Sequence, residues 1–154
     1  MINYDKFKIT KQTALISENL VFLRLRPIKK IDFQSGDLMS ISLKGYKSPR
    51  LYRVGKLGKE ILLSIQWYPN ESCSSYICSL NIGDTIQGIV KKNHQFHFPK
   101  EVTSVWYIAD GTGTFPYLGS LNENHKTYLN LIWEGKTESS FKYFREFLED
   151  TPSL

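Results

Sequence analysis

The sequence predicts a small antiparallel β-barrel followed by a truncated Rossmann-like βαβα unit, that is, a β domain joined to part of an α/β domain. Three observations support this prediction. Segments of the first hundred residues alternate apolar and polar side chains with the two-residue period of strands. Clusters of Gly, Asn, Asp and Pro separate these segments, as turns do. After Pro99 the chain changes to a continuous apolar run, a glycine-rich loop and helical spacing.

The first part of the chain is predicted to be made of strands. Three segments alternate clearly: residues 21–26 (VFLRLR), 39–43 (MSISL) and 61–67 (ILLSIQW). Turn signals lie between and around them, and no segment of this part predicts a helix. Short strands joined by regular turns favour a small antiparallel barrel or sandwich, which we assign to residues 1–100.

The second part follows strand–helix–strand–helix order. Residues 103–109 are predicted to form a strand that is buried on both faces of a parallel sheet, and residues 127–133 a second strand. Helices are predicted from about Phe115 to Glu123 and over residues 139–150. This order opens a doubly wound α/β domain. Because a complete domain takes roughly 100–150 residues, we expect residues 101–154 to be only its N-terminal portion.

Composition and charge limit the classes of partner. The chain has 154 residues, a net charge of +5 and neither a membrane-length apolar stretch nor a signal-peptide apolar region. We therefore expect a cytoplasmic protein without a membrane partner. The positive charge suits an acidic protein partner or an anionic ligand. Without a long basic run, nucleic acid is not the expected partner.

Cysteine and histidine give no sign of a metal site. Cys73 and Cys78 stand five positions apart with no further Cys or nearby His, so two small semi-buried side chains are expected. His94, His97 and His125 have no spacing typical of a triad or of metal ligands, and we expect them on the surface or in loops.

A glycine-rich loop follows the apolar run, in the stretch ADGTGTFPYLGSL at residues 109–121. Gly111 and Gly113 would let backbone N–H groups approach an anion closely, and Thr112 and Thr114 add hydroxyl donors. Pro116 is well tolerated in the first turn of the helix, whose N-terminus would face the same anion. The alternative interpretation is a tight strand-to-helix turn without a ligand.

The order of these features resembles the ferredoxin–NADP reductase superfamily of flavoproteins, over about residues 25 to 135. Residues 50–54 (RLYRV) resemble the R-x-Y-[ST] flavin motif, and residues 33–41 the strand that precedes it. Residues 72–84 resemble the segment that wraps the FAD pyrophosphate. Residues 129–137 resemble the second strand of the nucleotide domain. The resemblance therefore implies an FAD-binding barrel at 1–100 and the start of an NAD(P)-binding domain at 101–154, with its C-terminal part missing.

The resemblance also implies a role for individual residues. Arg50 would pair with the FAD pyrophosphate, and Tyr52 would stack on the isoalloxazine ring. Arg53 and Val54 complete the flavin motif. The remaining cofactor-binding residues fall into two groups, Cys73, Ser74 and Ser75 for the FAD pyrophosphate and Gly111, Thr112, Gly113, Thr114 and Pro116 for the pyrophosphate of NADH or NADPH.

Several residues depart from the family pattern, among them Ser35 in place of Pro and Lys136 in place of Arg. Arg53 stands where the motif has Ser or Thr, close to the flavin N5 in the family. Glu71 replaces a small residue before the pyrophosphate segment. Asp110 and Glu134 replace common glycines in the nucleotide domain.

The resemblance implies a flavin-dependent oxidoreductase that transfers electrons between NAD(P)H and a redox carrier such as ferredoxin or flavodoxin. No side chain is assigned a catalytic role, because the cofactor carries the hydride and the protein positions the rings. The departures keep an alternative open, a degenerate or truncated non-catalytic flavin- or protein-binding module of the same fold, so the sequence leaves enzymatic competence undecided. Open edges of the short second sheet favour self-association.

Overall fold

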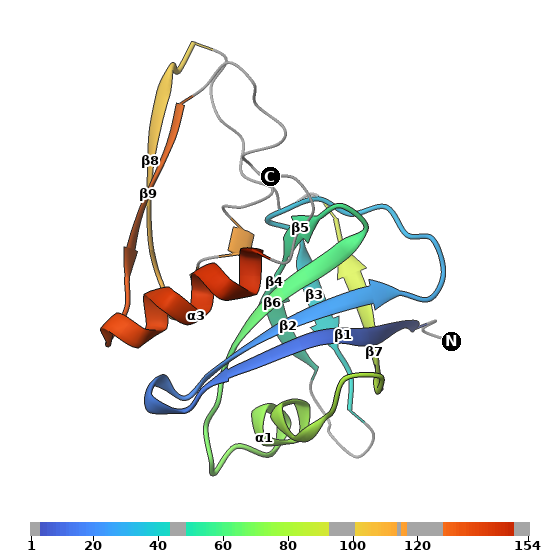
Figure 1. Ribbon diagram of the computed structural model, residues 1–154. Coiled ribbons are helices and arrows are strands. Elements are labelled where there is room, and N and C mark those ends of the chain that lie inside the picture. The colour runs from blue at the N-terminus through green and yellow to red at the C-terminus, as the bar shows by residue number, and fades with distance from the viewer. Residues whose placement is uncertain (1–3, 44–48, 93–100, 114, 117–127, 150–154) are drawn as a thin grey trace.

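The computed structural model describes residues 4–43, 49–92, 101–113, 115–116 and 128–149 (Figure 1). Within these ranges it has a seven-stranded antiparallel sheet and a two-stranded parallel sheet, which confirms the predicted fold class. The strands of the larger sheet are β1 (Asp5–Leu15), β2 (Leu20–Pro27), β3 (Leu38–Ile41), β4 (Arg50–Arg53), β5 (Gly55–Leu57), β6 (Glu60–Gln66) and β7 (Thr85–Lys91). The division into two domains stays a prediction.

The larger sheet curls round on itself. Its strand order is β4-β3-β7-β1-β2-β6-β5, so β4 and β5 lie at opposite ends of the sheet. In the chain only Val54 separates them. Because β4 pairs with β3 and β5 pairs with β6, one extended segment forms both edges. The backbone of Val54 is held by hydrogen bonds to Asp37 and Gly36 at 2.9 and 2.8 Å.

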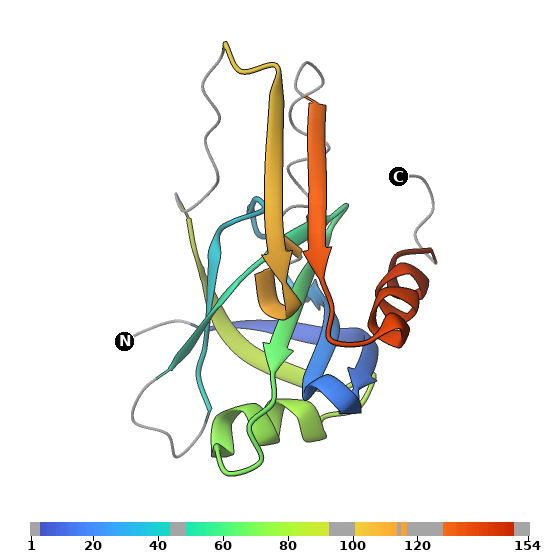
Figure 2. The same ribbon diagram turned by 90° about the vertical axis from the view of Figure 1, so that its left-hand side faces the viewer.

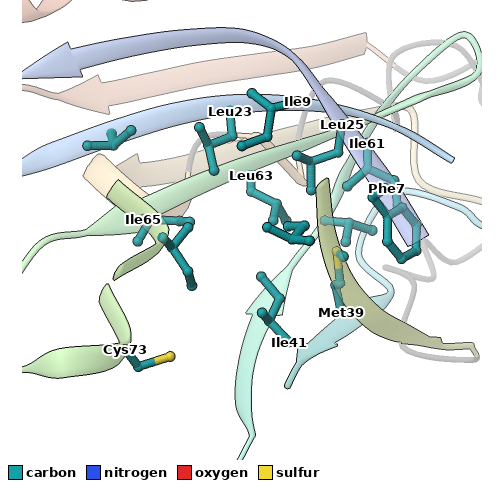
Figure 3. Packing of buried hydrophobic residues seen from close by; sticks show 14 of the residues in the cluster. Phe7, Ile9, Leu23, Leu25, Met39, Ile41, Ile61, Leu63, Ile65 and Cys73 are labelled. Atoms are coloured by element: carbon teal, nitrogen blue, oxygen red, sulfur yellow. The ribbon is translucent and has the colours of Figure 1, made fainter. Parts of the chain in front are cut away.

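Strand alternation fills the interior of this curled sheet (Figure 3). The predicted strands at 21–26, 39–43 and 61–67 correspond to β2, β3 and β6. Every second residue of these strands points inward, as expected for a period of two. The interior side chains include Phe7, Ile9, Leu23, Leu25, Met39, Ile41, Ile61, Leu63 and Ile65, all with no exposed surface.

The outer face of β2 is also buried, because the second part of the chain packs on it. Phe22 and Phe115 have no exposed surface, and their ring centroids lie 4.9 Å apart. Leu20 and Leu62 join the same cluster. Gly55 makes the close approach possible, since a Cβ on this residue would overlap the Phe115 carbonyl. Apolar clusters therefore lie on both faces of β2, and the outer one joins the two parts of the chain.

A helix that the sequence did not predict covers one end of the curled sheet. α1 spans Ser72–Ser79, within the segment that was expected to lack helices. The Glu71 side chain caps it by accepting the Ser74 N–H at 2.9 Å. Cys73 and Ile77, four positions apart, are buried against the sheet interior. Capping and this apolar pair offset the low helix propensity of its serines.

The smaller sheet pairs β8 (Ser104–Asp110) with β9 (Tyr128–Glu134), which run side by side in Figure 2. The expectation that this first strand is buried on both faces was wrong. Trp106 and Ile108 are 65% and 75% exposed. The opposite face of the pair contributes Tyr107 to the cluster around Phe115. A two-stranded sheet that packs on one side leaves its other face in solvent.

The last helix, α3 (Glu138–Glu149), lies within one residue of its predicted range. Its Phe141 ring packs on β9, where the centroid of the Trp133 ring lies 5.7 Å away. Of the helix predicted from Phe115, residues 115 and 116 are helical and residues 117–123 lie outside the described part of the chain. None of the helices described here has the length and apolar character to cross a membrane.

Candidate cofactor site

A pocket of about 320 Å³ opens where four segments distant in sequence meet. These segments are β4, β6, the approach to α1, and η2 (Gly111–Gly113), the 3₁₀ turn that follows β8. The pocket-lining residues are Arg50, Leu51, Tyr52, Arg53, Ser64, Gln66, Tyr68, Glu71, Ser74 and Thr112. Five of the residues that the sequence singled out for cofactor binding are thereby brought together, namely Arg50, Tyr52, Arg53, Ser74 and Thr112.

Tyr52 lies between the pocket and the sheet interior. Its ring packs against the interior cluster while the residue also lines the pocket. Burial, together with the adjacent Cys73 thiol, raises the pKa of the Tyr52 phenol far above its usual value. The hydroxyl therefore stays protonated at neutral pH, and the residue presents an uncharged aromatic surface to the pocket.

The Glu71 carboxylate bridges the Arg50 guanidinium and the Ser74 backbone N–H, the two groups best suited to bind an anion. Glu71 Oε1 lies 2.7 Å from Arg50 Nη2 and 3.0 Å from Arg50 Nε, while Glu71 Oε2 accepts the Ser74 N–H at 2.9 Å. Hydrogen bonds from Ser74, and secondarily Arg50, lower the pKa of Glu71. The same pair raises the pKa of Arg50. At neutral pH the bridge is a full ion pair at the first turn of α1.

The serines of α1 hold the turn that leads into it. The Ser74 hydroxyl accepts the Tyr68 N–H at 3.1 Å, and the Ser75 hydroxyl accepts the Trp67 Nε1–H at 3.1 Å. These bonds order residues 67–75 next to β4. The first turn of α1 is thus a fixed wall of the pocket.

Two hydrogen bonds hold the glycine-rich loop beside the pocket. Ser64 Oγ donates to the Gly111 carbonyl at 3.0 Å, and the Tyr107 hydroxyl donates to the Gly113 carbonyl at 3.1 Å. These bonds hold the turn from which Thr112 lines the pocket. A Cβ on Gly111 would make only ordinary contact with Leu20, at 3.6 Å. At Gly111, close packing does not explain the absence of a side chain.

Other predicted residues lie elsewhere. Val54 has no exposed surface and Cys73 is 5% exposed, so both side chains belong to the sheet interior. Burial raises the pKa of the Cys73 thiol. Pro116 is buried next to Phe115. Thr114 and the three histidines lie outside the described residues, and within those residues no group of His, Cys, Asp and Glu could hold a metal ion.

Sequence reasoning did not single out Ser64, Gln66 and Tyr68, which also line the pocket. The sequence did contain a signal for Ser64 and Gln66. In the segment ILLSIQ the outward positions are Leu62, Ser64 and Gln66, so the outer face changes from apolar to polar along the strand. That change marks the point where the packed interface ends and the pocket begins.

Comparisons with known proteins agree with this architecture. No protein-family model matches the chain, and no curated protein matches it significantly. A ferredoxin-NADP+ reductase from Plasmodium falciparum is similar with a TM-score of 0.70 and 20% identity, over 97% of this chain and 68% of that one. A ferredoxin NADP+ reductase from Neisseria gonorrhoeae, solved with FAD and NADP, gives 0.74 and 16%, over 97% and 64%.

A flavohemoglobin from Malassezia yamatoensis, solved with FAD and heme, gives a TM-score of 0.72 at 16% identity, over 96% of this chain and 42% of that one. The chain thus spans about two thirds of the reductases and less than half of the flavohemoglobin. All three similarities extend over at least 96% of this chain. This chain has the fold of the ferredoxin–NADP reductase superfamily.

Proposed function

We propose that the chain is a flavin-dependent oxidoreductase module that binds FAD in the 320 Å³ pocket and passes electrons between NAD(P)H and a redox carrier such as ferredoxin or flavodoxin. One observation carries the proposal. Arg50, Ser74 and Thr112 come from three distant parts of the chain and line one pocket. The first two suit a diphosphate, and Thr112 belongs to the loop assigned to the pyridine nucleotide.

Two features of the pocket favour flavin binding, and one opposes it. Tyr52 offers an uncharged aromatic surface, which favours stacking of a planar ring system. Arg50 and the first turn of α1 supply a guanidinium and a backbone N–H for a diphosphate. Glu71, however, engages both of these groups. A diphosphate could use these donors only if the Glu71 carboxylate moved aside.

Bound flavin would supply the capacity to accept two electrons at once and release them singly. The protein then has only to position the rings and limit water access. Tyr52 would face the ring, and the bonds from Ser64 and Tyr107 would hold the Gly111–Gly113 turn beside it. This arrangement would let a nicotinamide approach from the side of Thr112.

A basic groove supports the proposal of an acidic carrier. A groove of about 1010 Å³ lies between the end of β2 and the β5–β6 hairpin. We call it the basic groove; its charged residues are Arg24, Arg26, Lys29, Lys30, Lys56 and Lys59, with Asp32 and Glu60. Six cations face two carboxylates, so an acidic protein surface would be attracted over a long range.

The second candidate function is a non-catalytic flavin- or protein-binding module of the same fold. Glu71, which engages Arg50, and the cation at Arg53 favour this alternative. Such a module would bind flavin weakly or not at all and would not be reduced by NADH or NADPH.

The absorption spectrum of the purified protein tests the proposal. After incubation with FAD and removal of the excess, the protein is expected to keep flavin bands, and these are expected to bleach anaerobically on addition of NADH or NADPH. Flavin bands that do not bleach would favour the non-catalytic module. A colourless protein that takes up neither FAD nor other flavins would contradict flavin binding altogether.

A further inference from the structure

The ion pair inside the pocket has a consequence for which cofactor the pocket accepts. Among the described salt bridges it is the shortest and the only one that lines this pocket: Glu71 and Arg50 approach to 2.7 Å. Glu71 also accepts a backbone N–H in the first turn of α1, that of Ser74, at 2.9 Å. One carboxylate therefore uses the guanidinium and the backbone donor that the proposed diphosphate would need.

The Glu71 carboxylate occupies these donors as an anion that the protein itself supplies. A diphosphate and a carboxylate present the same chemistry to these donors, a delocalised negative charge on oxygen. They cannot both occupy the donors, and side by side they repel each other. Hydrogen bonds from Ser74 and the charge of Arg50 lower the pKa of Glu71, so its carboxylate is ionised at neutral pH. FAD must therefore displace an ionised group that already has its partners.

A flavin without a diphosphate meets no such competition. Riboflavin carries the same ring system, which would face Tyr52, while its ribityl chain ends in a hydroxyl. Glu71 can then stay on Arg50 and Ser74. The ring contributes its stacking free energy in both cases, whereas only the diphosphate has to break the ion pair.

We propose that Glu71 is a specificity-determining residue that competes internally with the diphosphate of the cofactor, so that the pocket binds FAD less tightly than its donors allow and discriminates little between FAD and riboflavin. The inference rests on the proposed flavin function. It differs from ordinary capping of a helix, because a simple cap would change stability and leave the preference among flavins unaltered.

The test compares the dissociation constants of FAD, riboflavin and ADP for the full chain and for Glu71→Ser. Serine is a good N-cap, so α1 keeps its capping residue while the charge is removed. Glu71→Gln serves as a second variant that keeps the side-chain length. The matched control is Glu60→Gln, which removes a carboxylate paired with Arg26 at 3.0 Å in the basic groove instead of in the pocket. Far-ultraviolet circular dichroism checks that each variant is folded.

Both Glu71 variants are expected to bind FAD and ADP about tenfold more tightly than the wild type, the effect of freeing one charged hydrogen-bonding partner. Riboflavin affinity is expected to stay within about twofold, and Glu60→Gln should leave the ratio of FAD to riboflavin affinity unchanged. Equal changes for FAD and riboflavin, or no change for FAD and ADP, would overturn the inference.

The two proposals fail in different ways. If riboflavin and FAD bind but Glu71→Ser leaves their ratio as in the wild type, the inference fails and the flavin function stands. If ADP gains affinity in the Glu71 variants and no flavin binds to any of them, diphosphate competition stands and the flavin function fails. If no flavin and no ADP bind to any folded variant, both are wrong.

Discussion

Arg53 introduces a fixed positive charge at the wall of the pocket. Its guanidinium donates to the Gly36 carbonyl at 2.9 Å, so the charge is held near β4. The flavin motif that residues 50–54 resemble has Ser or Thr at this position, close to the flavin N5. A cation near the ring would stabilise an anionic reduced flavin relative to the oxidised form.

We therefore expect Arg53→Ser to lower the midpoint potential of bound flavin. Loss of a partly screened charge worth about 1 kcal/mol corresponds to roughly 20 mV for a two-electron couple. Anaerobic redox titration measures the change. Arg53→Lys keeps the charge and should stay near the wild-type potential, whereas a serine variant with the same potential as wild type would show that the charge does not act on the ring.

Glu71 also makes stability depend on pH. Hydrogen bonds from Ser74, then Arg50, hold the pKa of Glu71 below its ordinary value of 4.5. A carboxyl group whose pKa is lower in the folded state stabilises the fold above the unfolded pKa. That contribution is lost as pH falls through the folded pKa.

Glu71→Gln is accordingly expected to reduce the free energy of unfolding at neutral pH, with the difference from wild type shrinking below about pH 4. Urea unfolding at several pH values measures this difference. A difference that keeps the same size down to about pH 2 would mean that the charge of Glu71 contributes nothing.

Some of the residues singled out from the sequence line the pocket, whereas others are buried in the sheet interior. Arg50 and Tyr52 were singled out by a strand motif, and both line the pocket. Val54 was singled out by the same motif and Cys73 by the segment that resembles the FAD-pyrophosphate segment, but both side chains are buried in the sheet interior. The difference arises because β4 passes into β5 at Val54, and because Cys73 lies on the inner face of a helix that was not predicted. The cofactor roles of all these residues stay predictions.

At the scale of elements, the contact between the two parts of the chain depends on Gly55 of β5. A Cβ there would overlap the carbonyl of Phe115, the residue whose side chain packs on β2 and β6. Gly55→Ala is therefore expected to reduce the free energy of unfolding by about 1–3 kcal/mol, as overpacking does.

Thermal or urea unfolding measures this effect, and Gly111→Ala is the matched control. A Cβ on Gly111 would meet Leu20 at 3.6 Å, an ordinary contact, so this variant should keep its stability within about 0.5 kcal/mol. Equal stability of both variants would mean that the two parts of the chain do not pack as described.

The alternating strands were more predictable than the helix α1 or the burial of β8. Strong alternation marked β2, β3 and β6, because one face of each is fully buried. α1 was missed since eight residues rich in serine carry little helical signal, although Cys73 and Ile77 have the spacing of a helix face. β8 was expected to be buried on both faces because its residues are apolar, but burial depends on neighbouring layers that a single segment does not reveal.

At the scale of the molecule, the charge distribution favours one docking surface. Lys29, Lys30 and Lys59 are exposed in the basic groove. Docking of an acidic carrier there would weaken as salt screens the charges. Self-association through the open edges of the β8–β9 sheet stays a prediction.

Lys29→Glu combined with Lys59→Glu is expected to slow electron transfer to an acidic carrier by about tenfold at low ionic strength, with a smaller effect at high salt. Stopped-flow measurement of carrier reduction tests this. The matched control reverses two exposed lysines near α3, Lys136 and Lys142, which lie outside the groove. If both double variants slow the transfer equally, net charge and not the basic groove guides the carrier.

The affinity of the protein for FAD, measured by equilibrium titration with Tyr52→Leu beside Tyr128→Leu, tests the location of the cofactor most directly. Tyr52 lines the pocket, whereas Tyr128 is 78% exposed on β9. Since one aromatic stacking partner is worth about 1–3 kcal/mol, Tyr52→Leu is expected to weaken FAD binding about tenfold or more, and Tyr128→Leu to leave it unchanged. FAD binding that is equally tight in wild type and in folded Tyr52→Leu would contradict the assignment of this pocket to the flavin.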